Sequence, residues 1–340
     1  MMKISIVILL CFLYFPFVAI AGQGKGLKIN IFSSQNGKGL EASRQILKNE
    51  LAELGHKIYE REFNEKCSEI CPQVDLNIFL EIINPEWLDR ATTNWFIPNP
   101  ECYVQDLALL DRIDLFLCRT HEVERICKSM NKRTFYIGFS SRDCFSTLIE
   151  KDYGLCIHIA GSSNLKGTEA ILEAWKGKDY LTDLTILIHY SLPHSIQPNV
   201  QWMMEKMPLP EFRLFQNNYG IHLCLSETEG FGHYLMEAMS TGAVVITTDG
   251  PPMNEFIVDK RCLVPYMKTA PCNLATLYYV DPEQLAKRVE DLMALSPEEL
   301  KEIGDRNRIN YLKKTKEFHK NLNRLMLMEF PYNRNPGRSI

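Results

Sequence analysis

Short apolar segments alternate with amphipathic helical segments along most of this chain, and this alternation restricts the fold more than any other feature. Each apolar segment has the length of a strand buried on both faces, and a polar loop and a helical pattern usually follow it. Such an order predicts parallel sheets covered by helices on both sides, the doubly wound α/β class. The expected strands are 27–32, 56–59, 75–81, 114–118, 133–138, 155–160, 184–189, 221–225 and 243–247. The expected helices are 40–54, 121–128 with Thr120 as its cap, 168–175, and one that begins near 297.

The alternation is interrupted once, in the polar stretch 139–153, and then starts again. Two halves of similar size predict two α/β domains that face a central cleft. Ligands of such sheets bind beyond the carboxyl ends of the strands, so we expect the functional residues in the loops there. The expected parts are a leader at 1–21, domains at 27–140 and 154–312, a helix at 313–330 that returns to the first domain, and a flexible tail at 331–340.

The leader has the layout of a secretory signal peptide. Lys3 precedes an apolar run over 4–21, and Ala19-Ile20-Ala21 ends that run with small residues around its last position. An uncleaved membrane anchor is the alternative, because the run has almost the length that spans a bilayer. We therefore expect an exported or membrane-associated protein that can contact a membrane through 4–21, and the side of the membrane stays open.

Charge and cysteine content narrow the function classes. The formal net charge is −4 and charged residues are mixed along the chain, so no nucleic-acid partner is expected. Among the 11 cysteines, Cys67 and Cys71 could pair in an oxidising compartment, and so could Cys262 and Cys272. No second ligand pair follows Cys67 and Cys71 at zinc spacing, and we expect no metal site.

The segment after the expected strand 221–225 carries the most chemistry. Its polar loop holds Glu229 and the glycines at 230 and 232, and a helix that begins near His233 carries Glu237, expected in its first turn. Glycines let a backbone approach a ligand closely, and the free N–H groups of a helix start suit a diphosphate. An ordinary turn followed by a helix with an N-terminal carboxylate is the alternative.

This segment resembles the Glu-x7-Glu motif of the retaining GT-B glycosyltransferases, the family 4-like glycosyl transferases group 1. The continuation 240–250 resembles that family's next strand and loop, and Glu255 falls where its members often have a glutamate. The resemblance implies a GT-B fold with two Rossmann-like domains. It also implies metal-independent transfer of a hexosyl-like group from a nucleoside diphosphate sugar to a glycan, lipid or protein acceptor, with no other cofactor.

The same resemblance implies residue roles in the second domain. Glu229 would contact hydroxyls of the donor sugar, and Glu237 would accept hydrogen bonds from the ribose. The sugar and diphosphate would be held by the backbone of Gly230, Phe231, Gly232 and His233.

Residues 159–175 resemble the family's strand, Gly-Arg loop, Lys-Gly pair and helix. Lys166 matches the lysine that stabilises the departing diphosphate, where negative charge develops. Ser162 stands where the family usually has arginine, so one expected cation is missing, and Arg142 is a candidate replacement. In the first domain, Gly37 and Gly39 resemble the glycine loop after the first strand, whose N–H groups would meet the diphosphate or the acceptor. An ordinary turn between strand and helix is the alternative.

Other residues are assigned more generally. The stretch 81–101 is expected to be a loop region that faces the acceptor, without individual roles. His158 and His189 are expected in the core, and His233 is expected to act through its backbone N–H rather than its ring.

Three other functions stay open. Ser162 is compatible with a catalytically weak or inactive nucleotide-sugar-binding protein, and a GT-B nucleotide-sugar epimerase would have the same motif. A dinucleotide-dependent oxidoreductase is the third, although neither glycine loop has the full Gly-x-Gly-x-x-Gly pattern.

Overall fold

A computed structural model describes residues 26–35, 39–68, 70–190, 192 and 197–331. The expected leader at 1–21, the glycine Gly37 and the tail beyond 331 lie outside these residues. In the part of the chain that is described, no helix combines the length and the apolar composition needed to cross a bilayer.

The first domain is built on a six-stranded parallel sheet with the order β2-β1-β3-β4-β5-β6. Its strands are β1 (Lys28–Ser33), β2 (Lys57–Glu62), β3 (Val74–Leu80), β4 (Ala91–Ile97), β5 (Leu115–Cys118) and β6 (Thr134–Tyr136). Its helices are α1 (Gly39–Glu53), α2 (His121–Ser129) and the 3-10 helices η1 (Pro85–Arg90), η2 (Pro100–Cys102) and η3 (Leu107–Arg112). From β1 the chain continues to β2 at one edge of the sheet, and from β3 it continues to β4, β5 and β6 toward the other edge. The topological switch point of this sheet therefore lies between β1 and β3.

The stretch 81–101 is not the loop region expected from the sequence, because it contains the central strand β4. Trp95 and Phe96 are fully buried, and β4 pairs with both β3 and β5. The sequence analysis missed this strand because its first half is polar and does not read as an apolar segment. Asn94 is nevertheless buried, since its side-chain amide donates to the carbonyl of Leu88 and its side-chain oxygen accepts from Asn77.

The second domain has a six-stranded parallel sheet with the order β12-β11-β10-β7-β8-β9. Its strands are β7 (Asp152–Gly161), β8 (Leu184–Ile188), β9 (Val200–Met203), β10 (Tyr219–Cys224), β11 (Val244–Thr248) and β12 (Leu263–Val264). Its helices are α3 (Thr168–Trp175), α4 (Leu209–Asn218), α5 (His233–Ser240), η4 (Met253–Glu255), η5 (Lys260–Cys262) and α6 (Pro282–Met293). Counted from its own first strand, this is the 3-2-1-4-5-6 order of the Rossmann sheet, with the switch point between β7 and β10.

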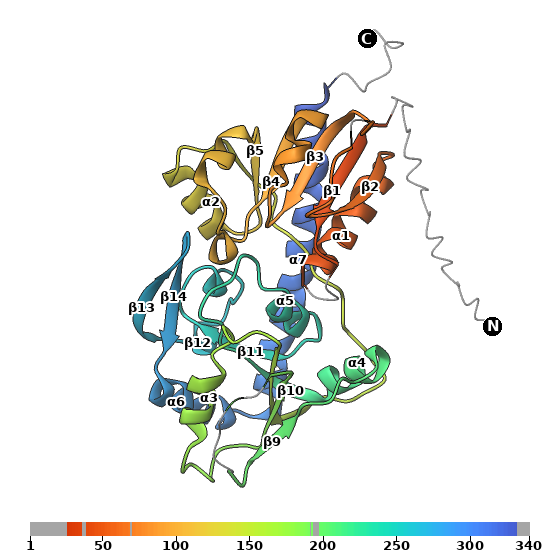
Figure 1. The fold of residues 1–340 in the computed structure, drawn as a ribbon. Coiled ribbons are helices and arrows are strands. Elements are labelled where there is room, and N and C mark those ends of the chain that lie inside the picture. Colours follow the sequence, from red (N-terminus) through yellow and green to blue (C-terminus); the bar gives the residue numbers. More distant parts are fainter. Residues whose placement is uncertain (1–25, 36–38, 69, 191, 193–196, 332–340) are drawn as a thin grey trace, which may run out of the picture.

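A hairpin that the sequence did not indicate extends from the second domain toward the first. It consists of β13 (Tyr266–Cys272) and β14 (Ala275–Val280), and Figure 1 shows it below α2. Its tip contacts η2 of the first domain, because Leu274 N donates to Pro100 O at 3.1 Å.

Neither expected cysteine pair is formed, and the hairpin explains this for Cys262 and Cys272. Cys67, Cys71, Cys262 and Cys272 are all free thiols. The hairpin carries Cys272 to the first domain, where its Sγ donates to the carbonyl of Glu101 at 3.6 Å, while Cys262 is buried in η5.

One long helix spans both domains. Helix α7 (Pro297–Glu329) is 33 residues long, and it runs without interruption past residue 312, where the sequence suggested a domain boundary (Figure 1). Its start is stabilised by a capping box between Ser296 and Glu299. Its end contacts the first domain, since Arg133 pairs with Glu329 and Asn321 donates to the carbonyl of Tyr136.

Beneath the cleft, the two domains share an apolar core. The ring of Phe139, from the segment that joins the domains, lies 5.3 Å from Phe231 of the second domain and 4.7 Å from Phe318 of α7, centroid to centroid. The position of one domain on the other is therefore set by packed side chains as well as by the chain connections.

Candidate functional site

A cavity of about 760 Å³ lies between the carboxyl ends of the two sheets. Loops next to both switch points line it, where doubly wound sheets bind ligands. With the exception of Gly37, which is not described, the structure places all the sequence-predicted site residues in its lining: Gly39, Ser162, Lys166, Glu229, Gly230, Phe231, Gly232, His233 and Glu237.

Gly230 and Gly232, in the loop before α5, are each required for a different steric reason. Gly232 is the N-cap of α5 with φ of 100°, a left-handed conformation that glycine adopts without strain. Gly230 is needed for close approach, because a Cβ there would lie 2.1 Å from Oδ1 of Asn99 in the first domain. The two walls of the cavity are therefore in close contact at this loop.

Lys166 and Glu229 form an ion pair on the second-domain wall. Glu229 Oε1 also accepts a hydrogen bond from Ser226 Oγ at 2.6 Å, and Ser226 Oγ lies 2.6 Å from the hydroxyl of Tyr234. The Lys166 ammonium lies 4.0 Å from the centroid of the Tyr234 ring, within the range of a cation–π contact. Both charged side chains reach the cavity and are held there by partners from their own domain.

Glu237 lies in the second turn of α5, one turn later than the sequence analysis expected, because the helix begins at His233. Burial raises the pKa of its carboxyl to about 7, while Arg142, Arg213 and a hydrogen bond from Ser141 act in the opposite direction. Arg142 and Ser162 line the same cavity as Glu237.

The ring of His233 has a structural role that the sequence analysis did not anticipate. Its Nε2 is hydrogen-bonded to Ser43 Oγ of α1 and its Nδ1 to Ser141 Oγ of the joining segment, both at 2.8 Å. Burial, with Arg119 and Lys166 nearby, lowers the pKa of the imidazole to about 3, so the ring is neutral at physiological pH. The side chain therefore links three segments at the base of the cleft.

On the first-domain wall, Glu101 and Arg119 are the main residues that the sequence analysis missed. Glu101 Oε1 accepts from the Gly230 N–H at 2.8 Å, and burial together with the nearby Glu229 raises the pKa of Glu101 to about 7. The Arg119 guanidinium lies 5.5 Å from the ring centroids of both Phe139 and Phe231. Arg119 directly follows the buried strand β5, which was the available signal in the sequence.

Three further residues from the sequence analysis are His158, His189 and Glu255. His158 is fully buried as expected, with its ring hydrogen-bonded to Leu223 O and Thr168. His189 is not a core residue, because it lies just past β8 and lines the cavity. Glu255 crosses to the first domain, where its carboxylate accepts from the first two backbone N–H groups of α2 at 2.8 and 2.7 Å.

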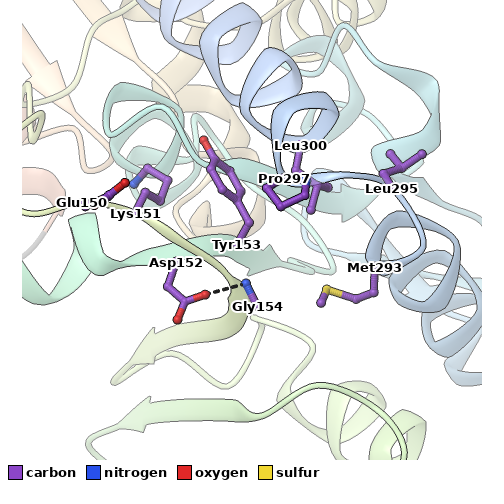
Figure 2. Close-up of a pocket in the computed structure, with 9 residues that line it drawn as sticks. All are labelled: Glu150, Lys151, Asp152, Tyr153, Gly154, Met293, Leu295, Pro297 and Leu300. Atoms are coloured by element: carbon purple, nitrogen blue, oxygen red, sulfur yellow. Dashed lines mark hydrogen bonds between the residues drawn. The ribbon is translucent and has the colours of Figure 1, made fainter.

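A second hollow, shown in Figure 2, lies at the opposite end of the second domain. Its polar groups are already used by neighbours, since Asp152 accepts from Gly154 N at 2.8 Å and Lys151 Nζ donates to Asn217 O at 2.8 Å. It has about 630 Å³ but no convergent set of polar groups, so the central cavity is the candidate site. Among the described residues, no cluster of His, Cys, Asp and Glu side chains is arranged to hold a metal ion.

Comparisons with known proteins gave a family match for most of the second domain. The family model of the glycosyl transferases group 1 matches residues 145–309, which contain most of the second domain and its wall of the cavity. A search of the curated proteins gave no match.

Several solved structures resemble most of the chain. A glycosyltransferase from Rickettsia africae superposes with a TM-score of 0.68 at 12% identity, over 89% of this chain and 98% of that one. Sucrose-phosphate synthase from Thermosynechococcus elongatus gives 0.68 at 11% identity, over 89% and 99% of the two chains. Anabaena HepE in complex with UDP and glucose gives 0.63 at 9% identity, over 88% and 99%. At such identities the likeness concerns the fold.

Proposed function

Because residues 145–309 match the family model of the glycosyl transferases group 1 and the chain has the GT-B fold, we propose that this protein is a glycosyltransferase that transfers a sugar from a nucleoside diphosphate donor with retention of configuration. The observation that carries the proposal is the placement of Lys166 and Glu229 side by side in the cavity, next to the start of α5. A cation, an anion and free backbone N–H groups are thereby available to one ligand.

The proposed donor pose follows from these groups. The diphosphate lies at the start of α5, where the N–H groups and the helix dipole favour negative charge. Lys166 stabilises the departing diphosphate, and Glu229 orients the sugar through its hydroxyl groups. Glu237 accepts hydrogen bonds from the ribose. The bond between the anomeric carbon and the phosphate oxygen breaks, and the acceptor oxygen forms the new bond; we assign no enzymic nucleophile.

Arg142 supplies the second cation in this proposal. Ser162 carries no charge, but Arg142 lines the same cavity and acts on the pKa of Glu237, so its charge lies near the proposed ribose site. The departing diphosphate would then have two cations, Lys166 from the second domain and Arg142 from the joining segment.

The domain assignment and the location belong to the same proposal. The first domain holds the acceptor, which is a glycan, lipid or protein, and the second holds the donor. Metal is not required. The leader at 1–21 exports the protein or attaches it to a membrane, and N-terminal sequencing of the membrane and soluble fractions would test this.

The decisive experiment is a donor panel scored by release of nucleoside diphosphate. UDP-, GDP- and ADP-sugars are each incubated with wild type, Lys166→Ala and Glu229→Ala. We expect release from at least one donor and a loss on the order of 100-fold or more in each variant, as for other groups that stabilise developing charge. Lys176→Ala is the matched control, because Lys176 pairs only with Glu173 on the exposed side of α3 and its loss should leave release unchanged.

Other outcomes select among the alternatives. Tight nucleotide binding without release from any donor would favour an inactive binding protein, and a donor sugar with altered stereochemistry would identify an epimerase. Tight NAD binding would favour an oxidoreductase.

Activity retained in both variants would remove the site assignment, and a product of inverted anomeric configuration by NMR would overturn retention. Activity lost on addition of EDTA and restored by a divalent metal would overturn metal independence.

A further inference from the structure

Three polar side chains at successive strand ends form a connected network on the first-domain wall. Glu81 follows β3, Asn99 follows β4 and Arg119 follows β5, and all three line the cavity. Asn99 Nδ2 donates to Glu81 Oε2 at 2.6 Å, and the Arg119 guanidinium donates to Asn99 Oδ1. Arg119 also donates to Ser43 Oγ at 3.1 Å. The network thus fixes the direction of each side chain relative to the next.

Two polar atoms on this wall lack a partner among the described residues. Glu101 Oε2 and Arg119 Nε are buried without a hydrogen bond. Leaving a buried donor or acceptor unpaired costs about 1–3 kcal/mol, so each such atom calls for an explanation, of which a bound water or ligand is one. Glu101 Oε2 can accept a hydrogen bond and Arg119 Nε can donate one, and a hydroxyl group can do both.

Backbone strain occurs at the same place. Glu81 has φ of 66°, a left-handed conformation that is uncommon outside glycine, asparagine and aspartate. Such strain persists where the surrounding structure enforces it and is common at ligand sites. Here it places the Glu81 carboxylate against Asn99.

The charge on this wall is negative. Glu81, Glu101 and Glu229 all act on the pKa of Arg119 by raising it, although burial holds that pKa down at about 10. Glu229 is already paired with Lys166, so on its own wall one guanidinium faces the two carboxyl groups of Glu81 and Glu101, and its charge is compensated before any ligand arrives. A phosphate or carboxylate on an acceptor would meet a net negative surface, whereas neutral hydroxyl groups would meet good hydrogen-bond acceptors.

We propose that Glu81, Asn99, Glu101 and Arg119 form the acceptor subsite, and that this subsite takes an uncharged sugar hydroxyl rather than a phosphorylated or otherwise anionic acceptor. This inference rests on the proposed function. In the transfer, the acceptor oxygen bonds to the anomeric carbon, the bond from that carbon to the phosphate breaks, and the hydroxyl proton leaves with the nucleoside diphosphate. Glu81 and Arg119 hold the acceptor through its other hydroxyl groups.

The test compares matched neutral and anionic acceptors with the most active donor of the panel. Methyl glycosides of glucose, galactose and mannose are compared with the corresponding 6-phosphates, and transfer is measured by mass spectrometry. We expect at least one neutral glycoside to be used with a kcat/KM at least tenfold above that of its phosphate.

The variant Glu81→Gln keeps the shape of the side chain and removes its charge. We expect it to lower kcat/KM for the neutral acceptor about tenfold, while the Kd of the nucleoside diphosphate changes less than twofold. Glu86→Gln is the control, because Glu86 pairs with Lys66 on the surface outside the cavity. Thermal unfolding checks that both variants are folded.

Three results would overturn the subsite. They are a preference for the phosphorylated acceptors, donor hydrolysis without transfer to either class, and an unchanged neutral-acceptor kcat/KM in folded Glu81→Gln. A failure of the proposed function looks different, since the wild type would then neither bind a nucleoside diphosphate nor release one from a donor.

Discussion

The two walls of the cavity hold their charged groups by different means. On the second-domain wall, Lys166, Glu229 and Ser226 bond to one another, and all come from loops at the switch point of one sheet. On the first-domain wall, Arg119 and Asn99 are hydrogen-bonded within their own domain, but Glu101 bonds to Gly230 and Arg119 also packs on Phe231, both across the cleft. The second-domain wall can keep its arrangement when the domains separate, whereas the first-domain wall then loses the partner of Glu101 and the packing of Arg119 on Phe231.

The largest effect on this difference between the walls is expected from a substitution at Gly230, where the walls are in contact. In Gly230→Ala the new Cβ would meet Asn99 Oδ1, so the walls could not close to their present distance. A displacement of about 1 Å between reacting groups can cost on the order of 100-fold in rate, and we expect a loss of that size in kcat. The Kd of the nucleoside diphosphate, measured by calorimetry, should change much less.

Two further variants make the Gly230 result specific. Gly154→Ala, at the far end of the second domain, adds a Cβ that meets only the rotatable Asp152 carboxylate and should leave kcat unchanged. Adding Asn99→Ala to Gly230→Ala removes the obstructing amide and should restore part of the closure, seen as a smaller radius of gyration. Normal kcat in Gly230→Ala would show that the walls need not meet.

A second test uses the acid buried on the second-domain wall. The folded-state pKa of Glu237 is about 7, above its ordinary value of 4.5, so the protonated form favours the folded protein. Its stabilising effect is present below pH 4.5 and is lost as the pH rises through 7. From pH 4.5 to pH 8, Glu237→Gln should therefore gain free energy of unfolding relative to wild type.

We expect this gain to be on the order of 2 kcal/mol, less than the full shift would give, because the carboxyl keeps some contact with cavity water. Denaturant unfolding at several pH values measures it, and Glu302→Gln on the exposed side of α7 is the control. Parallel stability curves for Glu237→Gln and wild type would contradict the assignment of a buried acid.

The smallest expected effect concerns Glu255, which belongs to the second domain but caps α2 of the first. Glu255→Gln removes the negative charge and one of two hydrogen bonds to that helix start. We expect kcat/KM to fall about 3- to 10-fold, equivalent to the loss of one charged cap. Glu124→Gln, which changes a carboxylate of α2 that pairs with Lys128, should have no such effect on steady-state kinetics.

The same contrast explains which parts of the site could be predicted from the sequence. Glu229, Gly230, Gly232 and Glu237 lie in one short segment, so their spacing along the chain indicated their common location. Glu81, Asn99 and Arg119 come from three different strand ends, and only the strand order of the folded sheet brings them together. Strand β4 was missed because its first half is polar, and without it the order of the strand ends could not be derived.

The uninterrupted helix α7 limits how the protein can move. Near its middle, Tyr311 donates to Ser141 O at 2.8 Å, and Thr315 is hydrogen-bonded to Ser140 at 2.9 Å, so both covalent connections between the domains pass one point. A helix has a fixed rise of about 1.5 Å per residue and does not stretch. The domains therefore cannot slide apart along the helix, and any further opening of the cleft is a rotation about that point.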